Sequence, residues 1–290
     1  MTAAADHRVM PGIYRRLSLV GFTRPFINRH LLPDWWDEDL AKSSGGLLET
    51  AAMLSRGTGL PIDYILGDRS GYELPEARFK RAKEAQPSEF ETAVLFGSAL
   101  ARSIAAACEA PYAPLPRDAS ALRASILESG APWVDLQRLV DTCWKSGVPV
   151  VHLPKARLPT RAQRKMEGMA LFTPEGRPVI VLTSARRDPF LLFDLAHEVG
   201  HVALGHVTPD SPLLVDEQIP GGADTDLEAD ELDANRYAIG VLAGGKAFKS
   251  ERLLRGDLLA AEAARVGREF QVDPGHLVLN YAETQRRAGV

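Results

Sequence analysis

A histidine–glutamate motif stands in the second half of the chain, where His197, Glu198 and His201 fall within five consecutive residues. Two histidines four residues apart lie about 40° apart around an α-helix and one turn apart along it. Both imidazoles can therefore direct a nitrogen to one metal ion, and zinc is the ion that this pattern indicates. Glu198 projects about 100° from His197, where a carboxylate can hydrogen-bond a water at the ion and act as a general base.

The motif needs a helix to position it, and the flanking residues predict one. Asp188 and Pro189 form an N-cap and first-turn pair, helically spaced apolar residues follow, and Gly205 predicts the end. The same helix without a metal would bury three ionisable groups without compensation. A structural zinc would need a fourth protein ligand, normally cysteine, and neither Cys108 nor Cys143 has a ligand-like spacing.

A catalytic zinc needs a third protein ligand, which the motif itself does not contain. The metzincin pattern requires Gly and His three and six residues after the second histidine, whereas Gly205 and His206 follow at four and five. We therefore expect His206 on the surface beyond the helix end, or at most near the substrate. In gluzincins the third ligand is a glutamate from a second helix, and six downstream carboxylates compete for this role: Asp224, Asp226, Glu228, Asp230, Glu231 and Asp233.

Helical phase separates these candidates. The apolar side of the predicted second helix consists of Leu227, Ala234, Ala238, Val241 and Leu242. Glu231 and Asn235, four residues apart, lie together along the border of that side. We predict Glu231 as the third ligand and Asn235 as a residue that supports the site. No sequence signal identifies an oxyanion-stabilising group, for which His152, His206 and Tyr237 are the candidates.

Strands are predicted just before the motif helix. A β-branched run at Val148–Leu153 predicts one strand, and Gly168–Thr173 and Pro178–Thr183 predict a hairpin. We therefore expect a small antiparallel sheet. After the helix, Asp210–Asp226 contains several prolines and glycines and predicts a solvated loop, in the manner of a lid or insertion between the ligand helices.

The metal region is acidic. The window from Asp188 to Asn235 contains twelve Asp and Glu but no Lys or Arg. Such a field would attract a divalent cation and a basic substrate segment.

Length and patterning indicate two domains in this chain of 290 residues. Helical spacing across Gly46–Leu66 predicts two short helices joined by a turn, and Phe90–Cys108 predicts a longer helix. Prolines at 111, 114 and 116 would stop that helix. We therefore predict a helical domain over residues 1–112 and a second domain over residues 118–290.

Composition excludes several classes of protein. The 34 Lys and Arg against 38 Asp and Glu leave a formal charge of -4, which excludes a basic nucleic-acid footprint over the whole chain. No run of 18 or more apolar residues occurs, and the N-terminus lacks the apolar core of a secretion signal, so no membrane association is expected. Two distant cysteines favour a reducing cytoplasm, with both thiols in the core.

Two motifs together carry a family resemblance. They are Phe193-Asp-Leu-Ala-His197-Glu198-Val-Gly-His201 and Glu231-x-Asp233-Ala234-Asn235-x-Tyr237-Ala238. From about Val134 to the C-terminus the chain resembles the ImmA/IrrE family of zinc metallopeptidases, in which the first Glu of the second motif completes the metal site. Asp233 replaces the usual Glu and Tyr237 the usual Phe. The resemblance implies a partner substrate, a helix-turn-helix transcriptional repressor that is cut at one site to release stress-response or mobile-element genes.

The N-terminal region carries a second resemblance. Ala51–Asp68 is similar to the closing helices of an Xre-type helix-turn-helix domain. The preceding stretch, where a recognition helix should lie, holds four carboxylates that would repel phosphate: Asp34, Asp37, Glu38 and Asp39. We therefore favour a degenerate domain that binds protein over one that binds DNA.

The sequence thus predicts an α+β protein with a helical N-terminal domain and a minimal zincin, gluzincin-like peptidase domain. His197, His201 and Glu231 would hold zinc, and Glu198 would be the catalytic base of an endopeptidase. The alternative is a regulator without enzymatic activity that binds DNA or a partner and senses metal. Glu198 argues against this alternative, since a sensor has no use for a base at that position.

Overall fold

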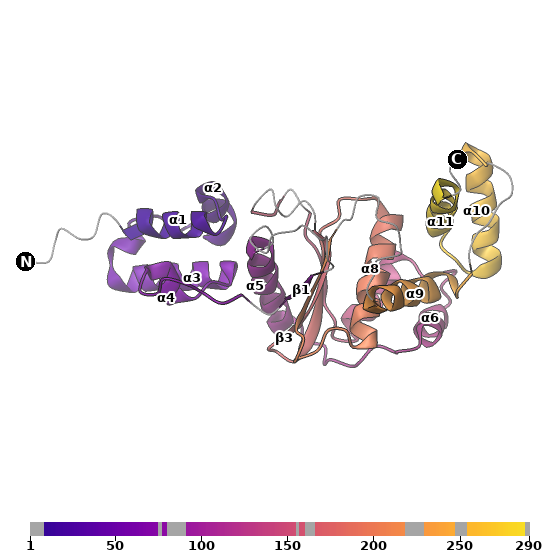
Figure 1. The fold of residues 1–290 in the computed structure, drawn as a ribbon, viewed down its shortest axis with the longest axis horizontal. Helices are drawn as coiled ribbons and strands as arrows, with labels where there is room; N and C mark the ends of the chain where they lie inside the picture. Colours follow the sequence, from indigo (N-terminus) through magenta and orange to yellow (C-terminus); the bar gives the residue numbers. More distant parts are fainter. Residues whose placement is uncertain are drawn as a thin grey trace, which may run out of the picture.

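The protein has a mixed α+β fold, described from a computed structural model (Figure 1). The structure describes residues 9–74, 77–79, 91–154, 157–159, 166–217, 229–246 and 254–287. The strands of these ranges are β1 (Ala77–Phe79), β2 (Val150–His152), β3 (Met166–Thr173), β4 (Arg177–Leu182) and β5 (Leu213–Glu217). The helices and turns are α1 (Val9–Leu19), α2 (Arg24–Phe26), the π-helical turn η2 (Ile27–Leu31), the 3₁₀ turn η3 (Leu40–Lys42), α3 (Ser44–Thr58), α4 (Ile62–Leu66), α5 (Glu91–Ala107), α6 (Ala119–Leu127), α7 (Leu136–Lys145), α8 (Asp188–Leu204), α9 (Ala229–Ala243), α10 (Gly256–Phe270) and α11 (Pro274–Arg287).

The sheet is mixed rather than antiparallel, which corrects the sequence prediction. In the described part of the chain its five strands follow the order β1-β5-β3-β4-β2. The predicted hairpin is confirmed, because β3 pairs antiparallel with β4, but β2 pairs parallel with β4 and β1 parallel with β5. Parallel neighbours need a long crossover connection, which local turn signals cannot reveal.

Strand β5 corrects a second expectation, because it forms inside the stretch 210–226 that the sequence predicted to be a solvated loop. Leu213, Leu214 and Val215 are all buried. They pair with β3 in antiparallel register, so that Leu214 lies opposite Ala170. Three consecutive apolar residues fit a strand that is covered on both faces, a pattern that the neighbouring prolines and glycines obscured.

Helices cover both faces of the sheet (Figure 1). On one face, α5 packs against β3 and β4 through a buried cluster that includes Val94, Ala101 and Val181. On the other face, α8 contacts β3 and β4 and is flanked by α9 and α7. The main core therefore lies between α8 and the sheet, where Leu195 and Val199 are fully buried.

The ends of α8 follow from local sequence, with one correction at its start. Arg187, rather than Asp188, occupies the N-cap position, and Asp188 and Pro189 are the first two helical residues. At the other end Gly205 has a left-handed backbone with φ of 81°. The His206 N–H donates to the His201 carbonyl and the Gly205 N–H to the Val202 carbonyl, which together form a Schellman turn.

Helices α8 and α9 approach closely because of a glycine between the two histidines. A Cβ at Gly200 would lie 3.0 Å from the Ala234 carbonyl oxygen and 3.3 Å from the Tyr237 Cβ. Any larger side chain would push α9 outward. Gly200 thus sets the distance at which α9 delivers its polar residues to α8.

A buried arginine fixes the far end of α9. The Arg123 guanidinium donates to four backbone carbonyls, those of Val241, Leu242, Phe270 and Gln271. These carbonyls end α9 and α10, where intrahelical partners are lacking. Arg123 therefore ties α6, α9 and α10 together and restricts movement of α9 along its axis.

The N-terminal helices form a separate buried cluster around Ile13, Leu17 and Leu54. The two predicted short helices are confirmed as α3 and α4, with the turn at Gly59. Within residues 32–43 the only helical element is the three-residue turn η3. That is too short for a recognition helix, which must lie along a DNA groove.

Helix α5 belongs to the packing of both halves. Leu95 joins the N-terminal cluster, while other residues of α5 pack on the sheet. The boundary between residues 112 and 118 therefore stays a prediction. Both cysteines are buried, as expected. Among the described helices, none combines the length and apolar character that a membrane span requires.

Candidate metal centre

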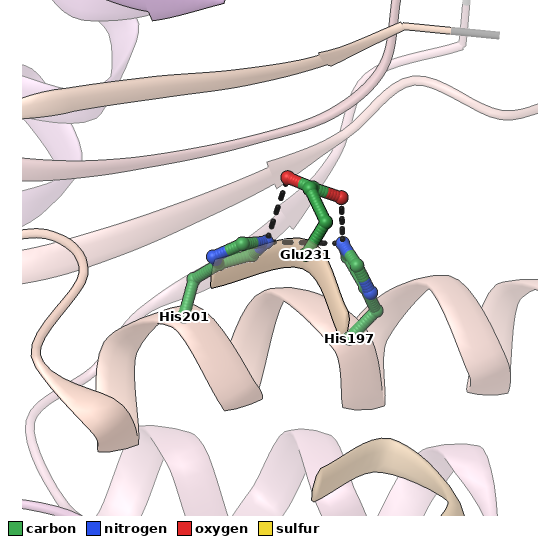
Figure 2. A group of neighbouring side chains, drawn as sticks. All are labelled: His197, His201 and Glu231. Atoms are coloured by element: carbon green, nitrogen blue, oxygen red, sulfur yellow. Dashed lines mark hydrogen bonds and ion pairs between the residues drawn. The ribbon is translucent and has the colours of Figure 1, made fainter. Parts of the chain in front are cut away.

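His197 and His201 project their rings from one side of α8, and Glu231 reaches them from α9 (Figure 2). The two Nε2 atoms are 3.0 Å apart. One oxygen of Glu231 lies 3.4 Å from the His197 Nε2, and the other lies 3.4 Å from the His201 Nε2. All three residues are nearly fully buried, with exposed fractions of 4% or less.

These separations fit a metal site. Ligand atoms about 2.0–2.1 Å from a tetrahedral zinc are about 3.3 Å apart, close to the separation of the two Nε2 atoms and to that of each Nε2 from one Glu231 oxygen. One ligand atom from each lies within 4.8 Å of the others. Two imidazoles and a carboxylate also form a donor set that leaves one position of a tetrahedral ion open, as catalytic sites require. The three residues predicted from the sequence are thus brought together.

The far nitrogen of His197 is held by α9. Its Nδ1 lies 3.0 Å from the Asn235 Oδ1. An amide oxygen only accepts hydrogen bonds, so this contact places the proton of a neutral His197 on Nδ1 and leaves a lone pair on Nε2. The predicted supporting role of Asn235 matches this geometry, since metal-binding histidines commonly donate their second N–H to a fixed acceptor.

The far nitrogen of His201 faces another histidine. The Nδ1 atoms of His201 and His206 are 2.9 Å apart, and the His206 Nε2 lies 3.6 Å from an Asp230 carboxylate oxygen. The His206 side chain is only 12% exposed, which corrects the expectation of a surface residue. Burial lowers the pKa of the His201 imidazole, which favours the neutral ring that a metal ligand needs.

Glu198 lies beneath the sheet and is only 1% exposed. A Cβ at Gly168 in β3 would lie 2.0 Å from the Glu198 Oε1, far inside van der Waals contact. The strand can cover this carboxylate only because residue 168 is glycine. The sequence predicts Gly168 in a strand, but its contact with Glu198 has no sequence signal, since strand register is not encoded locally.

The competing carboxylates lie elsewhere. Asp233 pairs with Arg236 at 3.0 Å and is 52% exposed. Asp230 is 40% exposed beside His206. Glu228, Asp224 and Asp226 fall outside the described residues. Among the described candidates, only Glu231 faces both motif histidines.

The oxyanion candidates are bound to backbone groups or to the site itself. The Tyr237 hydroxyl donates to the Pro116 carbonyl at 2.6 Å. The His152 Nε2 lies 2.7 Å from the Ser184 carbonyl oxygen, so this nitrogen donates to it. His206 contacts His201. The geometry therefore assigns none of the three to an oxyanion.

Searches with this sequence against models of known protein families and against curated proteins found no match.

Proposed function

We propose that this protein is a zinc-dependent endopeptidase. The observation that carries the proposal is the convergence of His197, His201 and Glu231, with the buried Glu198 next to His197 in the same helix. Zinc in this donor set would supply a Lewis acid that polarises a peptide carbonyl and acidifies a water.

Glu198 would move the protons of the reaction. As the water oxygen bonds to the carbonyl carbon, Glu198 accepts a proton from the water. When the C–N bond breaks, the same carboxyl returns that proton to the leaving amine nitrogen. Strand β3 packs closely over the Glu198 carboxylate at Gly168. This packing supports the role of a base, because a buried and closely packed carboxylate is held in one orientation.

The arrangement of elements supports a zincin of the gluzincin type. A motif helix packs under a sheet, and a second helix supplies a glutamate as third ligand. The ImmA/IrrE resemblance rests on the motifs of α8 and α9, the two helices that meet at the site. We extend the proposal from the resemblance to a substrate of the same kind, a helix-turn-helix repressor cut at one position.

The charge of the region supports a basic substrate segment, since residues 188–235 carry no Lys or Arg. In the N-terminal helices, Trp35 is 65% exposed and Trp36 donates its indole N–H to Thr50. An exposed tryptophan and the absence of a recognition helix from the described residues 32–43 favour contact with protein rather than DNA.

A timed digest tests the proposal. The full-length, zinc-loaded protein is incubated with a helix-turn-helix repressor encoded beside it, and Glu198→Gln serves as the matched variant. The wild type should produce two discrete fragments, while Glu198→Gln should retain zinc and cut about 10²- to 10⁴-fold more slowly. Equal rates would exclude Glu198 as the base. A wild type that cuts nothing but binds operator DNA, with affinity falling steeply in salt, would replace the peptidase with the regulator.

A further inference from the structure

His206 is the residue whose position departs most from the sequence prediction, and a local turn explains where it lies. In the Schellman turn after α8, His206 occupies the position that folds back over His201. The two rings are 5.1 Å apart between centroids and inclined by 62°. The His206 Nδ1 faces the Nδ1 edge of His201, away from the Nε2 that approaches Glu231, and His206 is not part of the ligand group.

The contacts of His206 support His201 in the form that a metal ligand takes. When a metal ion takes the lone pair of the His201 Nε2, a neutral ring carries its proton on Nδ1. Asp230 faces the His206 Nε2, so the His206 Nδ1 can accept from the His201 Nδ1–H across 2.9 Å. This contact holds the opposite edge of the His201 ring, with Nε2, toward His197 and Glu231.

We propose that His206, backed by Asp230, is a positioning residue that holds the His201 ring in the orientation that directs its Nε2 at the metal. The inference rests on the proposed metal site and deepens it. It also gives α9 a wider role. This helix supplies Glu231 as a ligand, Asn235 at the Nδ1 of His197, and Asp230 at the Nε2 of His206. Both metal-facing histidines then have a proton acceptor at their second nitrogen, one direct and one through a second imidazole.

The hydrogen bond between the two rings can be measured without substrate. In the zinc-loaded full-length protein, ¹⁵N–¹H correlation NMR should show the His201 Nδ1–H as a signal that exchanges slowly with water. His206→Ala should lose that protection. A His201 Nδ1–H signal that is equally protected in the variant would overturn the inference.

Zinc affinity, measured by competition with a chelator, gives the second readout. His206→Ala should weaken zinc binding about 10- to 100-fold. His206→Gln should recover part of the loss, because its amide oxygen can accept from the His201 Nδ1–H. Asp230→Asn should have a smaller effect, and Asp233→Asn, on the same helix but on the surface, should have none.

Unfolding of the metal-free variants separates positioning from general damage. His206→Ala and His206→Gln should unfold at similar denaturant concentrations, so that only zinc affinity tells them apart. Equal zinc loss in both variants, in step with lost stability, would show a structural role and overturn the inference. If the wild type bound no zinc, the proposed function would fail and this inference with it. If the wild type bound zinc no more tightly than His206→Ala, the inference alone would fail.

Discussion

His197 and His201 in α8 and His276 in α11 are all nearly fully buried, but their ring nitrogens face different surroundings. The two α8 histidines each have a polar group at both nitrogens. His276 stacks on Phe193 with ring planes inclined by only 10°. Neither of its nitrogens has a hydrogen-bond partner among the described residues. Burial lowers the pKa of His276 to about 4.

The difference shows that burial alone does not make a histidine a metal ligand. Desolvation lowers the pKa of both His201 and His276, because it disfavours the charged imidazole. A ligand also needs a ring orientation fixed by a hydrogen bond and a second donor at a matching distance, and these come from α9 and the turn after α8. His276 lacks both among the described residues, so its role is to pack α11 against α8.

The sharpest test of this comparison is the zinc content of variants from the two regions. The double variant His197→Ala, His201→Ala should lose the single equivalent of zinc expected in the wild type, because two of three protein ligands are gone. His276→Phe should keep it. Elemental analysis of dialysed protein decides the point, and full zinc occupancy in the double variant would refute the site assignment.

The second prediction compares two carboxylates on α9. Glu231→Gln should lose more zinc affinity than the 10- to 100-fold expected for a supporting residue, whereas Asp233→Asn should bind as the wild type does. The two side chains differ by about 200° in helical phase, and only Glu231 faces the histidines. Chelator competition measures both affinities. A similar loss in the two variants would contradict this difference between the two side chains.

Gly168→Ala tests the cover over Glu198. The added Cβ would collide with the Glu198 carboxylate and displace it, so we expect cleavage to slow by up to about 10²-fold while zinc is retained. Overpacking should also lower the free energy of unfolding by about 1–3 kcal/mol. Gly71→Ala is the matched control, because a Cβ there meets nothing within 4 Å. Unchanged cleavage by Gly168→Ala would argue against Glu198 as the base.

Replacing His276 should have the smallest effect on the metal site. Its effect should instead appear in the pH dependence of stability. Its folded pKa lies below the ordinary value of 6.5, so the unfolded chain takes up a proton first as pH falls from about 6.5 toward 4. Through His276, the free energy of unfolding of the wild type should therefore fall by about 2 kcal/mol as the pH is lowered from 7.5 to 5. Urea unfolding of metal-free protein should show a flatter pH dependence for His276→Phe. Parallel pH profiles would mean that His276 is not the buried neutral group described here.

Much of the candidate site could be predicted from the sequence, because its determinants are local. The spacing of His197 and His201 and the phase of Glu231 and Asn235 follow from the period of an α-helix. The sequence also predicts the end of α8 at Gly205. A glycine at a helix end indicates a Schellman turn, and such a turn would have predicted the contact of His206 with His201. A helix that ends in a Schellman turn brings the second residue after its end over the residue that starts the last turn.

Other features were decided only by tertiary structure. The mixed sheet, strand β5 and the cover of Glu198 by Gly168 all depend on strand register, which pairs residues that are far apart in the chain. The pairing of Asp230 with His206 depends likewise on how closely α9 approaches α8, which Gly200 and Arg123 set together. Periodicity identifies the face of a helix, but the partner of that face is selected by packing over the whole core.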